Sequence, residues 1–291
     1  MRYHITTLGC AKNTVDSEMM GELLAQAGHR AVENPRRADV VVVNTCGFIA
    51  AARDESYAAL RALARSKGRR QWLVAVGCLA QRYGDEIKRH VPQVDAILGT
   101  RDWPQIAAVV EQLQRGGPTA LAPTDGAGLI ATVRRRAALG ATAYLQIADG
   151  CDAACAFCAI PLIKGRQRSK PPEDVLREAR ELVAQDVREI ILIAQDTTAY
   201  GRDLAGRGRL SDLLRALAPL VPATSWLRLL YAYPQHVSPA LIETMASLPQ
   251  MCHYLDLPLQ HGHPEVLKRM ARPHDVDVIY GLVEDLRRAM P

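Results

Sequence analysis

The sequence is poor in aromatic residues and has no long hydrophobic run. Aromatic side chains make up 5% of the 291 residues, so the cores must be built mainly from Val, Leu, Ile and Ala. No apolar run approaches the roughly 18 residues that a membrane-spanning helix needs. The N-terminus, Met1-Arg2-Tyr3-His4, is too polar for the core of a signal peptide. The sequence therefore predicts a soluble, cytoplasmic protein with no membrane partner.

The composition also argues against disorder and against a disulfide framework. Hydrophobic residues make up 48% of the chain and charged residues 23%, which is ordinary for a globular protein of about two domains. The seven cysteines are odd in number, and in a reducing compartment they indicate metal binding or catalysis. The net charge of +5 is compatible with an RNA-rich partner but does not require one.

The first domain is predicted over residues 1–115. Its strand patterns are continuous apolar runs, and helical patterns lie between them, which is typical of a parallel sheet covered on both faces. We expect a flavodoxin-like parallel α/β domain. Its strands are expected at 3–8, 39–43, 72–76 and 95–98, and two of its helices at 50–65 and 102–115.

A stretch rich in glycine and proline, residues 116–140, predicts an interdomain linker. Residues 141–291 then repeat the alternation of strands and helices, which fits a β/α barrel or part of one. The expected strands are 143–148, 189–194, 226–231 and 254–258. The expected helices are 172–184, 209–218, 238–247 and 275–289.

Three cysteines follow the first strand of the second domain. Cys151, Cys155 and Cys158, here called the second triad, are separated by three and then two residues. Such short spacings let one loop wrap an iron–sulfur cluster. Three thiolates leave one iron without a protein ligand, and an open position marks a catalytic metal site. The alternative is a structural zinc site, which would need a fourth Cys or His nearby.

Three more cysteines are far apart in the sequence but have similar surroundings. Cys10, Cys46 and Cys78, here called the first triad, each follow a predicted parallel strand and lie beside a glycine. The carboxyl ends of parallel strands face one crevice, and a helix start lowers the pKa of a thiol. The pattern indicates a second metal site. The alternative is three buried structural cysteines, which are common in cores. Cys252 has no partner pattern and is expected to pack as a small hydrophobic residue.

The second triad, with Phe157 before its last cysteine, resembles the radical-SAM signature. Joined to the first domain, it resembles the radical-SAM methylthiotransferase family, and within it the RimO type that modifies a ribosomal protein. The matching stretches cover nearly the whole chain: Leu8–Asn13, Asp16–Glu18, Asn44–Ile49, Gly77–Arg82, Ile193–Thr198, Tyr200–Gly201, Arg228–Tyr231 and Tyr254–His261.

The resemblance implies two 4Fe-4S clusters and S-adenosyl-L-methionine as cofactors. It implies that the cluster on the second triad cleaves S-adenosylmethionine, and that the resulting radical takes a hydrogen atom from the β-carbon of an aspartate in small-subunit ribosomal protein number twelve, with possible proximity to ribosomal RNA. The first-triad cluster supplies sulfur, so an electron donor and a sulfur donor are further partners.

Four residues outside the triads are expected to contact S-adenosylmethionine. Phe157 would contact adenine, Gln195 and Asp196 the methionine part, and Gln260, at the end of the fourth strand, the ribose. The alternatives are loop packing for Phe157 and a simple turn for Gln195 and Asp196.

Two other functions stay open at this stage. One is methylthio transfer to an adenosine in transfer RNA, and the other is a two-cluster electron carrier, which would neither bind nor cleave S-adenosylmethionine. Members of the family continue past the matched region with further barrel strands and a TRAM β-domain, so we expect the chain to lack the end of the barrel and that domain.

Overall fold

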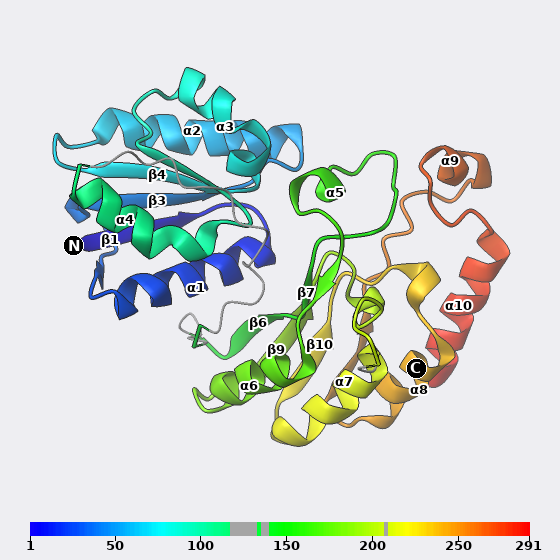
Figure 1. The fold of residues 1–291 in the computed structure, drawn as a ribbon. Helices are drawn as coiled ribbons and strands as arrows, with labels where there is room; N and C mark the ends of the chain where they lie inside the picture. The colour runs from blue at the N-terminus through cyan, green and yellow to red at the C-terminus, as the bar shows by residue number, and fades with distance from the viewer. Residues whose placement is uncertain (117–132, 135–139, 207–208) are drawn as a thin grey trace. The chain divides into compact units, whose positions relative to one another are not determined.

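The structure is a computed structural model that describes residues 1–116, 133–134, 140–206 and 209–291. It divides into two compact units, shown in Figure 1. The first consists of Met1–Arg136 and Leu162–Lys164, and the second of Ala137–Pro161 and Gly165–Pro291. The predicted linker, 116–140, falls largely outside the described residues. No helix in the described ranges is long and apolar enough to cross a membrane.

The first unit is built on a five-stranded parallel sheet with the order β2-β1-β3-β4-β5. This is the strand order of flavodoxin-like folds. The strands are β1 (Arg2–Thr7), β2 (Arg30–Ala31), β3 (Val40–Thr45), β4 (Trp72–Gly77) and β5 (Ala96–Gly99). The four predicted strands are confirmed, and only the two-residue β2 is an addition.

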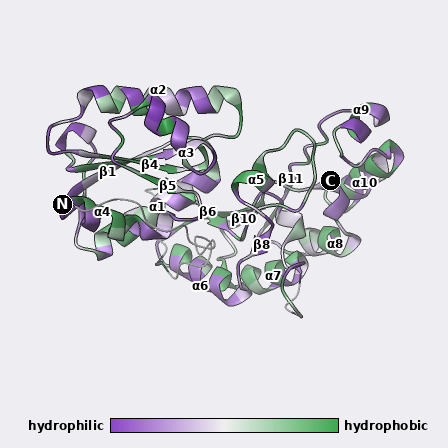
Figure 2. Cartoon of the chain, turned by 45° about the horizontal axis from the view of Figure 1, so that its top comes forward, coloured by the Kyte–Doolittle hydropathy of each residue, from purple (hydrophilic) through white to green (hydrophobic). Residues whose placement is uncertain are grey.

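Four helices cover the two faces of this sheet. They are α1 (Ala11–Gln26), α2 (Ala50–Ser66), α3 (Cys78–His90) and α4 (Ile106–Gln114). Helices α1 and α4 lie on one face, and α2 and α3 lie on the other (Figure 1). All six residues of β3 are buried because helices cover both of its sides. Hydrophobic and hydrophilic residues alternate along α2, as Figure 2 shows, because one side of the helix faces the sheet.

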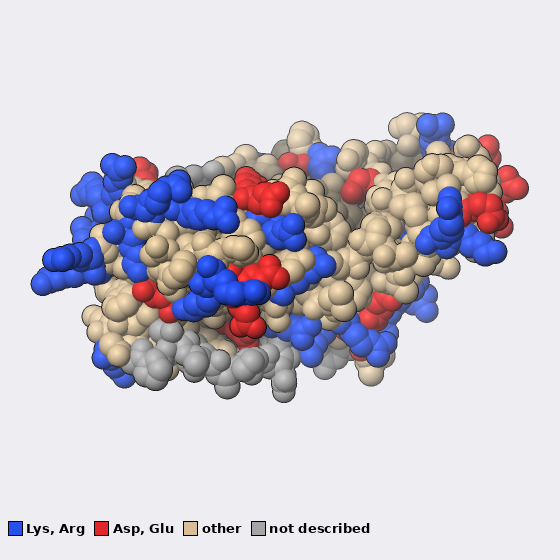
Figure 3. All heavy atoms as spheres, turned by 90° about the horizontal axis from the view of Figure 1, so that it is seen from above, with Lys and Arg blue, Asp and Glu red and all other residues tan. Residues whose placement is uncertain are grey.

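The basic residues Arg65, Arg69 and Arg70 are exposed at and just after the end of α2. Helix α2 ends at Ser66, and Arg65 lies in its last turn, where a positive charge interacts favourably with the helix dipole. Figure 3 shows the lysines and arginines of the described residues mixed with acidic side chains on this face.

The second unit is built on a four-stranded parallel sheet with the order β11-β10-β9-β6. Its strands are β6 (Thr142–Gln146), β9 (Glu189–Ile193), β10 (Trp226–Leu229) and β11 (Met251–Leu255). Its helices are α6 (Pro172–Val183), α7 (Leu210–Leu217), α8 (Pro239–Ser247), α9 (Pro264–Arg269) and α10 (Val276–Ala289). The short helix α5 (Ile160–Ile163) belongs partly to each unit. Short 3₁₀ helices occur at Pro35–Arg37, Trp103–Gln105, Thr197–Ala199, Ala218–Leu220 and Pro234–His236. The core of this unit lies between the sheet and helices α6, α7 and α8.

The prediction for the fourth strand of this sheet was wrong by three residues. The apolar pattern suggested 254–258, but β11 is Met251–Leu255 and Met251 pairs with Leu227. The strand begins before Tyr254 because the Met251 side chain is buried and the Leu227 N donates a hydrogen bond to the Gln250 carbonyl. Tyr254 is 46% exposed, so its strand-like pattern did not reflect burial.

A two-stranded antiparallel ribbon was not predicted. Strands β7 (Ala148–Asp149) and β8 (Arg168–Ser169) pair with each other, and the second triad lies in the loop between them. Each strand has only two residues, which is too short for a periodic signal in the sequence. The ribbon therefore closes the base of the cysteine loop.

Candidate active site with two cysteine triads

The three cysteines of the first triad lie at the carboxyl ends of three adjacent strands. Cys10 precedes α1 after β1, Cys46 directly follows β3, and Cys78 begins α3 directly after β4. Strands β1, β3 and β4 are parallel neighbours, so all three residues lie at one edge of the sheet. A Cβ on Gly9 would lie 2.7 Å from the Cys46 Cβ, so only glycine permits the loop before Cys10 to approach Cys46 so closely.

Buried amides join the loops that carry the first triad. The Asn13 Nδ2 donates to the carbonyls of Leu8 and Thr45 at 2.7 and 3.2 Å. The Asn44 Nδ2 donates to the Asn13 carbonyl and to the Ser17 hydroxyl. The Asn13 side chain is 1% exposed and links the loop before Cys10 to the residue before Cys46.

The low pKa expected for the first-triad thiols was wrong for Cys78 and Cys46. Burial raises the pKa of the Cys78 thiol to about 12, and burial raises that of Cys46 as well. The backbone N–H of Phe48 acts in the opposite direction on Cys46 but is the weaker effect. Desolvation therefore outweighs the helix start. Binding a metal would supply the positive charge that turns these thiols into thiolates.

The second triad occupies a loop whose backbone is tied at both ends. The Cys151 N donates to the Gly165 carbonyl at 3.1 Å, and the Cys158 N donates to the Cys155 carbonyl at 3.0 Å. Gly150 has a φ of 73°, and a Cβ there would collide with the carbonyl of Arg166. Glycine is thus required immediately before Cys151.

Backbone N–H groups already point at two of the second-triad sulfurs. Ala153 N lies 3.4 Å from the Cys151 Sγ, and Ile160 N lies 3.4 Å from the Cys158 Sγ. Burial raises the pKa of both thiols, and these N–H groups lower it in part. Donors of this kind favour the thiolate that a cluster needs.

Arg272 is a functional candidate that the sequence did not reveal. Its Nη1 lies 3.6 Å from the Cys155 Sγ. The only sequence signal was a basic residue after a short helix, and it lies 117 positions from Cys155.

The expected contacts to S-adenosylmethionine have different surroundings. The Asp196 carboxylate accepts hydrogen bonds from Thr198, Ala199 N and His236, so it organises the turn after β9. The charge of Asp196 contributes to the raised pKa of Cys151, after burial and the opposing Ala153 N–H, so the two residues are near each other. The Gln195 Oε1 is buried, and no hydrogen-bond partner for it lies among the described residues.

Phe157 and Gln260 are both exposed. Phe157 is 49% exposed within the cysteine loop. Gln260 does not end the fourth strand as expected, because β11 ends at Leu255, five residues earlier. Its φ of 79° is in the left-handed region, which residues other than glycine rarely adopt. Contacts of these residues with the cofactor stay predictions.

The residues present fit clusters better than single metal ions. Within the described ranges, no three His, Cys, Asp or Glu side chains are close enough to hold one metal ion. In a cuboidal cluster each thiolate binds a different iron, so the sulfurs lie farther apart than around one ion. All six donors are thiols, which are the ligands of iron–sulfur clusters. Cys252 lies in β11 and belongs to neither triad.

Comparison with known families gives two separate matches along the chain. Residues 2–99 match the model of "Uncharacterized protein family UPF0004", and residues 145–291 match the "Radical SAM superfamily". The solved structure of the radical S-adenosylmethionine methyltransferase TsrM from Kitasatospora setae has a TM-score of 0.70 at 14% identity, covering 99% of this chain and 65% of that one. The cobalamin-dependent radical enzyme OxsB gives 0.66 at 9% identity, covering 98% and 47%. These likenesses show the fold.

Curated relatives are much closer in sequence. The ribosomal protein uS12 methylthiotransferase RimO of Herpetosiphon aurantiacus is 48% identical over all of this chain and 68% of its own length. The protein of the same name from Chloroflexus aurantiacus is 50% identical over all of this chain and 67% of its own length. The chain thus spans about two thirds of the length of these relatives. At this identity and coverage, the chain belongs to the RimO family of methylthiotransferases within the radical SAM superfamily.

Proposed function

We propose that this chain carries the catalytic part of a radical-SAM enzyme that adds a methylthio group to the β-carbon of an aspartate in ribosomal protein uS12. The observation that carries the proposal is the presence of two cysteine triads, one in each unit, in a chain that is 48–50% identical to curated RimO proteins. The relatives are named as uS12 methylthiotransferases, which favours uS12 over transfer RNA as the substrate.

In this proposal the second triad holds the cluster that binds S-adenosylmethionine. When bound, that cluster supplies the electron that breaks a carbon–sulfur bond of S-adenosylmethionine and starts radical chemistry. The chain's own part is to hold three thiolates on one loop and to leave the fourth iron open. The N–H groups of Ala153 and Ile160 stabilise two of these thiolates. The buried Gln195 Oε1 provides a hydrogen-bond acceptor at the carboxyl end of β9.

The first triad would hold the second cluster, on which sulfur is supplied. Its three thiols come from different strands, so their spacing depends on the sheet and on the amides of Asn13 and Asn44. Such a site keeps its geometry through the fold of the whole unit. The cofactors carry the difficult chemistry, and the protein supplies position and electrostatics.

The proposed reaction requires partner proteins and indicates a compartment. An external one-electron donor and a sulfur donor are required, and the substrate brings the protein near ribosomal RNA. A ribosomal substrate implies work in the cytoplasm.

The test is anaerobic reconstitution with iron and sulfide, followed by incubation with S-adenosylmethionine, dithionite and either uS12 or transfer RNA. Mass spectrometry should show the mass of a methylthio group on one aspartate of uS12 and no change in the adenosines of transfer RNA. A methylthio group on adenosine alone would identify the transfer-RNA activity instead. Failure to cleave S-adenosylmethionine, with both clusters present, would identify an electron carrier.

A further inference from the structure

The segment after α9 folds back onto the loop of the second triad. Helix α9 ends at Arg269, and Ala271 has a φ of 52°. The Arg272 N donates to the Leu267 carbonyl and the Ala271 N to the Lys268 carbonyl, at 2.9 and 3.0 Å. This pair of bonds is a Schellman motif, which reverses the chain direction at a helix end. The turn sets the direction in which the chain leaves α9 at Arg272.

The same turn contacts the cysteine loop through the backbone. The Ala156 N, between Cys155 and Cys158, donates to the Met270 carbonyl at 3.0 Å. The position of Arg272 relative to Cys155 is therefore set by main-chain hydrogen bonds on both sides, and not by a flexible side chain alone.

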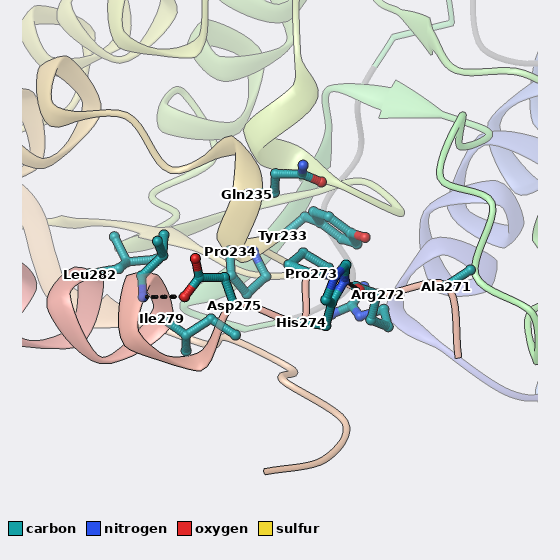
Figure 4. A pocket seen from close by; sticks show the side chains of 11 residues that line it. Tyr233, Pro234, Gln235, Ala271, Arg272, Pro273, His274, Asp275, Ile279 and Leu282 are labelled. Carbon is teal, nitrogen blue, oxygen red and sulfur yellow. Dashed lines mark hydrogen bonds between the residues drawn. The ribbon is translucent and has the colours of Figure 1, made fainter. Parts of the chain in front are cut away.

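The Arg272 guanidinium is buried and held by three groups. The residue is 7% exposed. Its Nη1 points at the Cys155 Sγ at 3.6 Å, its Nη2 donates to the Pro258 carbonyl, and its Cζ lies 4.1 Å from the centre of the Tyr233 ring. Figure 4 shows Arg272 and Tyr233 side by side in the wall of one pocket. Among the residues that the structure describes, none of these partners is a carboxylate.

A buried positive charge is costly unless an anion is close by. Of the three groups that hold the guanidinium, the sulfur of Cys155 is the one that becomes a thiolate when it binds a cluster. Tyr233 fixes the guanidinium plane from the other side, and Tyr233 is itself held by the His236 ring at a centroid distance of 5.1 Å. His236 in turn binds the Asp196 carboxylate at 2.6 Å. The arginine is thus built into a chain of contacts that runs from the end of β9 to the second triad.

We propose that Arg272 is a positioning residue for the cluster on the second triad, which orients the Cys155 thiolate and makes the cluster easier to reduce. The proposal rests on the proposed function in that the second triad must hold a cluster. A hydrogen bond to a ligand sulfur, and a positive charge beside it, favour the more negative, reduced state. The reaction concerned is the transfer of one electron from a low-potential donor to the cluster.

The experiment measures the reduction potential of this cluster by itself. All variants are made in the full chain with the first triad replaced by alanine, so that one cluster gives the signal. Arg272→Met removes the charge and the donor at similar length, and Arg272→Lys keeps the charge without the fork. The matched control is Arg269→Met, an exposed arginine three residues earlier in α9. Each protein is titrated anaerobically with dithionite, and the reduced cluster is counted by electron paramagnetic resonance.

We expect Arg272→Met to be at least about tenfold harder to reduce, which is about 59 mV for one electron. Arg272→Lys should shift in the same direction by less, and Arg269→Met should match the parent. If Arg272→Met binds less iron, the potential is read from the bound fraction and the lysine variant gives the second comparison. Equal potentials in the parent and both Arg272 variants would overturn this inference alone. Absence of a cluster from the parent would overturn it together with the proposed function.

Discussion

Replacing Asn13 by alanine should destabilise the first unit and empty its metal site. The Asn13 side chain is 1% exposed and gives hydrogen bonds of 2.7 and 3.2 Å to the carbonyls of Leu8 and Thr45. Alanine would leave both carbonyls without this donor. Each buried polar group that loses its partner costs about 1–3 kcal/mol, so for two carbonyls we expect a loss of about 2–6 kcal/mol in the free energy of unfolding.

Urea unfolding followed by tryptophan fluorescence measures this loss. Trp103 is 2% exposed in the first unit, whereas Trp226 of the second unit is 58% exposed, so the signal reports mainly on the first unit. With a slope of about 2 kcal/mol per molar urea, the midpoint should fall by about 1–3 M. Asn13→Asp, which cannot donate, should be no more stable than the alanine variant.

The matched control on the same helix is Gln26→Ala. Gln26 makes an exposed hydrogen bond to Glu22 at 3.1 Å, so its loss should change the free energy of unfolding by less than about 0.5 kcal/mol. The reasoning would be refuted by an Asn13→Ala midpoint equal to that of the control, or by full iron binding at the first triad in that variant.

Three further predictions concern the cysteines. Replacing the whole second triad by alanine should leave about half of the iron after reconstitution, because the first triad keeps its own thiolates; loss of all iron or of none would contradict two independent sites. Cys252→Ser should leave the iron content unchanged, and a fall would make Cys252 a ligand. The pKa of Cys78 is raised in the folded metal-free chain, so the stability it contributes is present below about pH 9 and is lost as the pH rises toward about 12. As the pH rises, the Tm of the parent should therefore fall more than the Tm of Cys78→Ser. Equal falls in the two Tm values would show that another group titrates.

The placement of both triads could be predicted from the sequence, because the residues next to each cysteine show which strand or loop it follows. Cys151, Cys155 and Cys158 share one loop, and Cys10 and its two partners each follow an apolar strand, so the parallel sheet brings them to one edge. The same apolar runs predicted four strands of the first unit and their parallel sheet.

The groups that orient the sulfurs could not be predicted in this way. Asn13 lies near the start of a helix in the sequence, and only the packing of β3 beside β1 brings the Thr45 carbonyl to its amide. Arg272 reaches Cys155 across 117 positions through a turn at Ala271 that no sequence period announces. The pKa of Cys78 depended on burial, which a strand-end pattern does not measure.

The central claim is that the two triads perform separate parts of one reaction, and Cys46→Ala tests it most directly. The variant is reconstituted anaerobically beside the parent, and 5′-deoxyadenosine and methylthiolated uS12 are measured in the same reaction. The account predicts that the folded variant still cleaves S-adenosylmethionine and forms no methylthiolated uS12. Loss of cleavage in a folded variant that keeps the second cluster, or continued methylthio transfer, would contradict it.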